Sequence, residues 1–192
     1  MSLLHRERVL RAATRSFLAH GYGSSVDAIA RRAGVAKQTV YEYFPSKDAL
    51  FQETARALTQ QVLVALDDAP RSLRATLVRF ALAYRRRVLG AQGIAMFRAL
   101  VPEVPRFRPL ARSMYAAGAG ETVRRLAACL EKAMQAGELR RDDPQFAAEL
   151  FLGMLVGQER VKRLFGVAAQ RAGDRVRAQR IVDCFLRAYK PC

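Results

Sequence analysis

The sequence is poor in the residues that enzyme and metal sites depend on. Its 192 residues include three cysteines and two histidines, and both histidines, His5 and His20, fall in the first predicted helix. Metal ions are held by closely spaced His, Cys or carboxylate side chains, and nucleophilic catalysis needs a nucleophile beside a base. The sequence has neither pattern, and it has no glycine-rich loop of the kind that cradles phosphates. We therefore expect no enzymatic activity, no metal and no cofactor.

Long apolar runs are also missing. No window approaches the roughly 18 uninterrupted apolar residues of a membrane-spanning helix, and the opening MSLLHRERVLRAA has charges where a secretion signal has an apolar core. The cysteines, Cys129, Cys184 and Cys192, are odd in number and lack CxxC spacing, which argues against a disulfide framework and fits a reducing compartment. We expect a cytoplasmic protein with no membrane partner.

The alternating apolar pattern of a half-buried strand does not occur over any long stretch. Apolar residues recur at spacings of three and four instead, so we predict an all-α fold. Glycines at 21 and 34 are expected to end the first two helices, and Pro45 breaks the pattern after the third. We predict a helical domain at residues 1–47 and a larger one, with a bridging helix, at residues 48–192. The predicted helices, about nine in total, span residues 4–20, 26–33, 36–43, 46–66, 71–89, 92–101, 107–136, 144–166 and 174–189.

Positive charge is what the chain has in excess. Its 33 Lys and Arg against 17 Asp and Glu give a formal charge of +16 and a pI near 10.9, which makes polyanions the first partners to consider. The charge is spread along the chain, since residues 1–47 hold only 8 basic and 3 acidic residues. Basicity therefore does not locate a site, and a non-specific, chromosome-associated DNA-binding protein remains an alternative.

The segment GVAKQTVYEYFPSKDAL, residues 34–50, places a glycine turn before a short helix with few apolar anchors. On a helical wheel Val40 and Phe44 form the inward face, and polar or aromatic side chains cover the rest. Two short helices joined by such a turn are the pattern of a helix-turn-helix, although an ordinary amphipathic helix in a bundle has the same periodicity. The outward side chains are Lys37, Gln38, Thr39, Tyr41, Glu42 and Tyr43.

Most of these residue types have a use on a DNA surface. Gln38 can bond an adenine edge in the major groove, lysines can neutralise phosphates, and hydroxyls or rings can contact phosphate oxygens or thymine methyls. The start of the preceding helix, with its free N–H groups, suits a phosphate. Glu42 would be repelled by phosphates and stays unassigned. The predicted DNA-binding residues are Ser24, Ser25, Lys37, Gln38, Thr39, Tyr41, Tyr43 and Lys47.

The stretch FLAHGYGSSVDAIARRAGVAKQTVYEYFPSKDALF resembles the N-terminal domain of TetR-family transcriptional regulators. It contains, in order, the family elements G-[YF], D-x-I-A, A-G-V, T-[VL]-Y-x-[YH]-F and S-K-x-x-L. The resemblance implies that six residues lie where the family commonly touches DNA, namely Lys37, Gln38, Thr39, Tyr41, Tyr43 and Lys47. It also implies that Ile29, Val35, Val40 and Phe44 are core. Between Gly21 and Ile29 the chain is one residue shorter than the usual pattern, and Ala36 stands where the family often has Ser.

The resemblance also implies that the larger domain binds a small effector and dimerises. A pocket needs apolar lining with a few polar groups, although each candidate could equally be ordinary core. The glycines of AAGAG, residues 116–120, predict a kink or bulge within the helix at 107–136. The candidate pocket residues are Phe80, Tyr84, Met96, Phe97, Phe107, Met114, Tyr115 and Met154.

Two broad apolar stripes near the C-terminus predict a four-helix interface between two copies of the chain, with intramolecular core as the alternative. Gly153 and Gly157 would permit close helix approach. The candidate interface residues are Phe146, Leu150, Phe151, Ile181, Val182, Phe185 and Leu186. The run Arg85–Arg87 is expected to be a solvated helix face.

Together these features predict a DNA-binding transcriptional regulator, most simply a repressor that binds a palindromic operator as a homodimer and is released by a small, largely apolar effector. An activator of the same fold and the non-specific DNA-binding protein are the alternatives. A variant in which a cysteine senses oxidants has no support from an activated thiolate.

Overall fold

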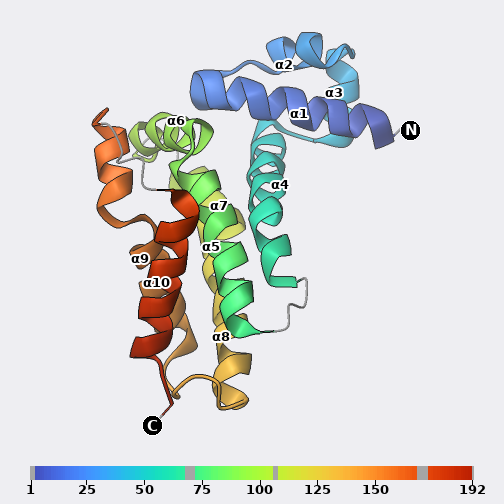
Figure 1. Ribbon diagram of the computed structural model, residues 1–192. Coiled ribbons are helices and arrows are strands. Elements are labelled where there is room, and N and C mark those ends of the chain that lie inside the picture. Colours follow the sequence, from blue (N-terminus) through green and yellow to red (C-terminus); the bar gives the residue numbers. More distant parts are fainter. Residues whose placement is uncertain (1–2, 68–71, 106–107, 168–172, 192) are drawn as a thin grey trace. The chain divides into compact units, whose positions relative to one another are not determined.

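The computed structural model describes residues 3–67, 72–105, 108–167 and 173–191, and every regular element in these ranges is helical (Figure 1). The all-α prediction is therefore confirmed. The elements are α1 (Leu3–His20), η1 (Gly21–Gly23), α2 (Val26–Ala33), α3 (Lys37–Tyr43), α4 (Lys47–Asp67), α5 (Leu73–Leu89), α6 (Ala91–Leu100), η2 (Val101–Glu103), α7 (Arg108–Tyr115), η3 (Ala116–Gly120), α8 (Glu121–Gln135), α9 (Pro144–Leu164) and α10 (Asp174–Ala188).

The chain folds into two compact units. The first consists of Met1–Leu58 and Ala95–Gly118, and the second of Thr59–Ile94 and Ala119–Cys192. Both α4 and α6 therefore contribute residues to each unit, whereas the sequence predicts one boundary after residue 47. None of the helices within the described ranges is both long enough and apolar enough to cross a bilayer.

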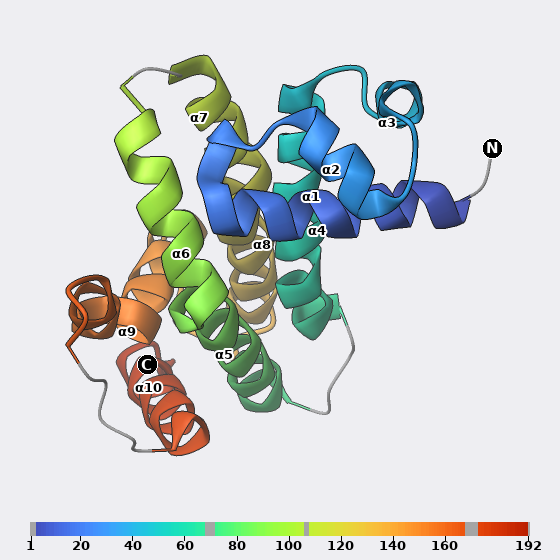
Figure 2. The ribbon, with the colours of Figure 1, turned by 90° about the horizontal axis from the view of Figure 1, so that it is seen from above.

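The core of the first unit holds α1, α2 and α3 together (Figure 2). Phe17 and Ile29 are fully buried in it, and Val40 anchors α3 from the other side. Gly21 and Gly34 have φ of 62° and 66°, a left-handed conformation that lets the chain turn sharply after α1 and after α2. The glycines thus end these helices where the sequence predicts.

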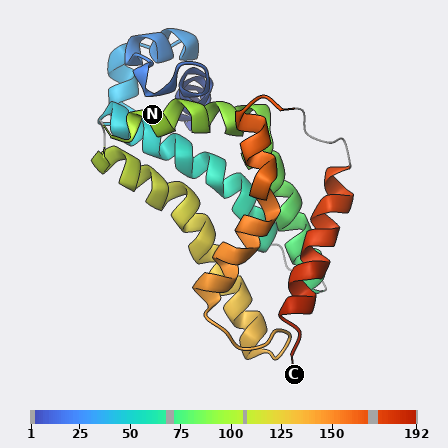
Figure 3. The same cartoon turned by 90° about the vertical axis from the view of Figure 1, so that its left-hand side faces the viewer.

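Aromatic side chains form much of the core of the second unit. Phe151 lies between Phe80, at a ring distance of 6.5 Å, and Phe185, at 4.8 Å, and Tyr189 stacks on Phe185 at 4.6 Å. Each fully buried phenylalanine contributes about 1.5–3 kcal/mol through the apolar area removed from water. In this unit α8 packs against α9, and α5 against α9 and α10 (Figure 3).

Two of the longer helices depart from regular α geometry. The AAGAG segment forms a π-helical turn, η3, between α7 and α8, which confirms the predicted bulge. In α9, Gly157 has a φ of 33° and a ψ of −136°, so the helix breaks there. The sequence predicts α9 as one uninterrupted helix, and the break follows from the conformational freedom of glycine at that position.

Candidate DNA-binding interface

Two buried side chains, one within α3 and one at its end, hold the helix so that its polar face points outward. Val40 and Phe44 are 1% and 4% exposed, so α3 is fixed in its rotation about its own axis. Gln38, Tyr41 and Glu42 are exposed on the opposite side, as the helical wheel predicts. An exposed amide and an exposed phenol ring on a short helix can reach base edges and the sugar–phosphate backbone of a duplex.

The side chains on the flanks of α3 are partly covered by, or paired with, other residues of the protein. Thr39 is half-buried, and Tyr43 packs partly against the core of the first unit. The ammonium of Lys37 lies 3.0 Å from the carboxylate of Asp27 in the first turn of α2. The hydrogen bond from this ammonium and the charge of Asp27 raise the pKa of Lys37. Because both partners are exposed, this ion pair is weak and Lys37 can exchange it for a phosphate.

The turn that joins α2 to α3 depends on Gly34. Its N–H donates to the carbonyls of Ala30 and Arg31, and its carbonyl accepts a 3.4 Å hydrogen bond from Arg8 of α1. A Cβ on Gly34 would lie 2.5 Å from Nη2 of Arg8, and the φ of 66° would strain any other residue. The turn therefore ties α1 to the helix-turn-helix.

Ser24 and Ser25 have different local roles. Ser25 caps α2, since its hydroxyl oxygen accepts a 3.1 Å hydrogen bond from the N–H of Ala28. Ser24 is 6% exposed and donates its hydroxyl hydrogen to the carbonyl of Ser16 at 2.9 Å. The Ser24 side chain thus fastens the segment before α2 to α1, a contact that the sequence analysis did not predict.

Lys47 stands at the first residue of α4, beside an aromatic ring from the segment before α2. Its ammonium lies 4.2 Å from the ring centroid of Tyr22, whose phenol donates a hydrogen bond to Asp48. Burial, together with the hydrogen bond to Asp48 and its charge, raises the pKa of Tyr22 to about 12. Burial lowers the pKa of Lys47. Sequence reasoning missed Tyr22, because an aromatic residue in a glycine turn gives no sign of which helix it will reach.

The candidate pocket residues are divided between the two units. In the second unit, Phe80 is fully buried and stacks on Tyr84 at a ring distance of 5.7 Å, and Met154 packs at the edge of the same core. Burial raises the pKa of Tyr84, although Arg160 opposes the shift. In the first unit, Met114 packs against the core that holds α3. The other candidates of the first unit are Met96, half-buried, and Phe97 and Tyr115, both exposed, while Phe107 lies outside the described residues.

A buried ionic cluster, which the sequence analysis did not predict, lies in the second unit. The guanidinium of Arg85 bonds Glu159 of α9 at 2.7 Å and Asp174 of α10 at 2.7 Å, and it donates to the carbonyl of Leu155. Glu159 also accepts from Arg163 at 2.8 Å. Burial would raise the pKa of Glu159, but hydrogen bonds from Arg85 and Arg163 outweigh it and lower the pKa.

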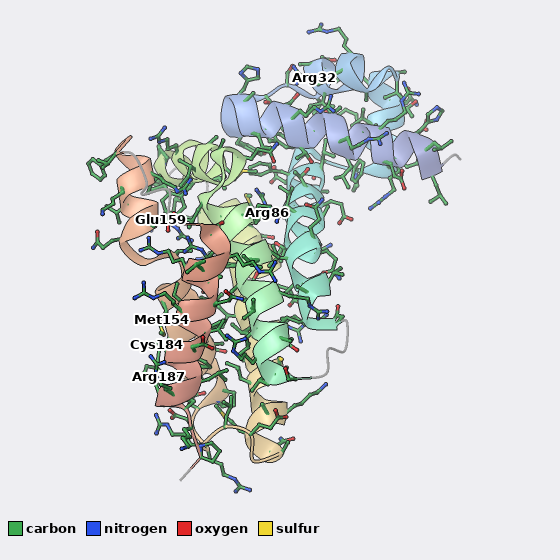
Figure 4. The ribbon with its side chains drawn as sticks, viewed as in Figure 1. Arg32, Arg86, Met154, Glu159, Cys184 and Arg187 are labelled. Carbon is green, nitrogen blue, oxygen red and sulfur yellow. The ribbon has the colours of Figure 1, made fainter. Side chains whose placement is uncertain are left out.

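The prediction that Arg85 belongs to a solvated face is therefore wrong, since it is 1% exposed. Its spacing could have revealed this, because Leu77, Ala81, Arg85 and Leu89 follow one another every four residues on the buried side of α5. Arg86, labelled in Figure 4, is exposed.

The predicted interface residues fall into two groups. Phe151, Val182 and Phe185 are fully buried in the core of the chain itself, which fits the alternative of intramolecular core for these three side chains. Phe146 and Leu150 are 54% and 40% exposed on α9. Ile181 and Leu186 are half-buried on α10, and Cys184, labelled in Figure 4, is exposed on the same helix.

Comparisons with known proteins agree with this arrangement. Residues 9–54 match the family model described as "Bacterial regulatory proteins, tetR family". Residues 75–191, more than half of the chain, match the model of the AefR-like transcriptional repressor C-terminal domain. This chain belongs to the TetR family. TetR-family members are DNA-binding transcriptional repressors that typically respond to small-molecule ligands and bind their operators as dimers.

Solved structures extend the match over nearly the full chain. A regulator from Mesorhizobium loti MAFF303099 has a TM-score of 0.79 and 26% identity and covers 99% of this chain and 100% of its own. The flavonoid-responsive regulator FrrA has a TM-score of 0.70 and 34% identity and covers 97% of each chain. The HTH-type transcriptional regulator YhgD of Bacillus subtilis (strain 168) is 36% identical over 70 residues, which span 36% of this chain and 37% of YhgD.

Proposed function

We propose that this TetR-family protein is a repressor that binds a palindromic operator as a homodimer and is released by a small, largely apolar effector. The observation that carries the DNA-binding part is the face of α3, where Gln38 and Tyr41 are exposed above the buried Val40. A recognition helix needs this combination, because its side chains reach the same bases only if the helix cannot rotate about its own axis.

The proposed contacts divide into one that reads sequence and several that position the protein. Gln38 reads a base edge, and Tyr41 contacts a base, the backbone or both. Lys37, Thr39, Tyr43 and Lys47 contact phosphates. At the start of α2 the phosphate contact is made by backbone N–H groups and by the exposed Ser25, while Ser24 supports this helix end from the inside.

The effector that we propose is an aromatic molecule with at least one hydroxyl group. Two observations support this choice. The stacked rings of Phe80 and Tyr84, with Met154 nearby against the same core cluster, are apolar and aromatic surroundings that include the half-buried phenol of Tyr84. FrrA, which is 34% identical over nearly the whole chain, is a flavonoid-responsive regulator. The phenol of Tyr84 is protonated at neutral pH and can therefore donate a hydrogen bond to such a hydroxyl group.

The proposed homodimer uses the exposed apolar side chains of α9 and α10. A two-fold dimer presents two α3 helices to two half-sites, and half-sites one helical turn apart are separated by roughly 34 Å. An effector that favours a dimer with another spacing between the α3 helices would lower the affinity for the operator.

Fluorescence anisotropy with the full-length protein tests this function. The duplexes are the intergenic DNA upstream of its own gene and a random duplex of equal length, each measured from 50 to 200 mM salt. We expect at least about a thousandfold preference for the upstream DNA at physiological salt. A panel of flavonoids and other hydroxylated aromatics should then release the complex. A preference near unity would contradict the proposal and would support non-specific binding.

A further inference from the structure

Tyr22 contacts three residues of the first turns of α4 with one side chain. Its phenol donates to Asp48, its ring face carries the ammonium of Lys47 at 4.2 Å, and its ring lies 5.2 Å from that of Phe51. Phe51 is 1% exposed and also contacts the buried Phe17 of α1 at 4.5 Å. Tyr22 is therefore anchored by the core on one side and reaches a charged group on the other.

The position of Tyr22 in the chain connects these contacts with the proposed DNA-binding residues. Tyr22 lies in η1, three residues before Ser25, which caps α2. The segment that enters α2 thus also fixes the first turn of α4. A phosphate contact made by Lys47 and one made at the start of α2 are consequently set by the same short segment.

Lysine is a poor positioning group unless something holds it. Its ammonium ends a flexible four-carbon stem, and this freedom is lost when it binds a phosphate. An ammonium over an aromatic ring is attracted by the negative face of the ring, and the phenol bond to Asp48 fixes that ring from its far end. Part of the ordering of Lys47 is thereby present before DNA arrives.

We propose that Tyr22 is a positioning residue for DNA binding, which holds the Lys47 ammonium in place for a phosphate. This inference rests on the proposed phosphate contact of Lys47. It assigns to Tyr22 no contact with DNA of its own. The ring face is the part that acts on Lys47, and the hydroxyl is secondary because it orients the ring.

The test uses the full-length protein and a random-sequence 30-bp duplex, so that it needs no operator. Dissociation constants are measured from 50 to 200 mM salt for Tyr22→Leu, Tyr22→Phe, Lys47→Met and the double variant Tyr22→Leu/Lys47→Met. Lys47→Met should lower the slope of log K against log[salt] by about 0.9 for each phosphate that Lys47 neutralises. Lys162→Met, on the exposed surface of α9, is the matched control and should leave the slope unchanged.

We expect Tyr22→Leu to weaken binding about three- to tenfold and Tyr22→Phe to weaken it less than twofold. The double variant should bind no more weakly than Lys47→Met, because Tyr22 acts through Lys47. Tighter binding by Tyr22→Leu would mean that the ring withholds Lys47 from DNA and would overturn the proposal. So would additive losses in the double variant, or a Tyr22→Phe variant as weak as Tyr22→Leu.

A measurement on the unmodified protein covers the case in which Tyr22→Leu does not fold. In NMR spectra the ε-methylene protons of Lys47 should be shifted upfield by the Tyr22 ring, both free and with the random duplex bound. Lys47 signals at the positions of a freely moving lysine would overturn the proposal. Loss of the preference for operator DNA would contradict the proposed function alone, since every measurement here uses random DNA or none.

Discussion

Gln38 is the residue on which sequence discrimination is expected to depend. Gln38→Ala should weaken specific binding by about 1–3 kcal/mol, or roughly 5- to 150-fold, because alanine cannot form the bidentate hydrogen bonds to a base edge. Binding to random duplex and the salt slope should not change, since every phosphate contact is retained. Anisotropy with operator and random duplex measures both. Gln61→Ala, at an exposed position of α4, is the control, and an equal loss on both duplexes would contradict a base contact.

For individual residues, the sequence predicts where some side chains lie and gives no information about the contacts of others. Val40, Phe44 and Gln38 lie where the wheel puts them, because the period of an α-helix alone decides which side of a short helix is buried. The contacts of Ser24, Tyr22 and Arg85 could not be assigned in this way, although the four-residue spacing of Arg85 marks it as buried. Their partners, Ser16, Lys47 and Glu159, are brought to them by tertiary packing, about which helical periodicity carries no information.

Among the elements, the limits of the helices follow from local chemistry and were largely predictable. Ser25 and Asp143 cap α2 and α9 with hydrogen bonds of 3.1 and 2.9 Å, and Pro144 occupies the first turn of α9. The break at Gly157 was not predicted, since a glycine inside a helical pattern also fits a regular helix. The carbonyl of Leu155, two residues before the break, accepts a hydrogen bond from Arg85, so α5 supports α9 at this point.

The ionic cluster is expected to make the stability of the protein depend on pH. Glu159→Gln should lower the free energy of unfolding by about 2–3 kcal/mol at pH 7, because it removes a charge from a buried pair while Asp174 still neutralises Arg85. The pKa of Glu159 is lowered by folding, so its contribution is present above its ordinary value of 4.5 and is lost as the pH falls through the folded value.

The unmodified protein and Glu159→Gln should therefore differ less in their free energy of unfolding below about pH 4.5. Urea unfolding at several pH values measures this difference. Glu149→Gln, at an exposed position of the same helix, is the control and should cost less than about 0.5 kcal/mol at every pH. A Glu159→Gln deficit that stays constant down to pH 3 would count against the ionic cluster.

For the whole molecule, the central prediction concerns self-association. Leu150→Glu should raise the dimer dissociation constant about 100-fold, or about 2.7 kcal/mol, because it places a carboxylate in the proposed apolar interface on α9. Sedimentation equilibrium gives the mass, and operator affinity should fall with the loss of the dimer. Val64→Glu, at a site 50% exposed on α4, is the matched control. A fully dimeric Leu150→Glu protein would place the interface elsewhere.

The five lysines of this arginine-rich chain have a practical consequence. The two in the N-terminal domain are Lys37, paired with Asp27, and Lys47, held over Tyr22. Amine-acylating reagents leave guanidinium groups almost untouched, so the abundant arginines would not obscure a chemical footprint. Mass spectrometry of the acylated protein, with and without DNA, can thus follow these two groups singly, against Lys132, Lys162 and Lys190 as internal references within the same molecule.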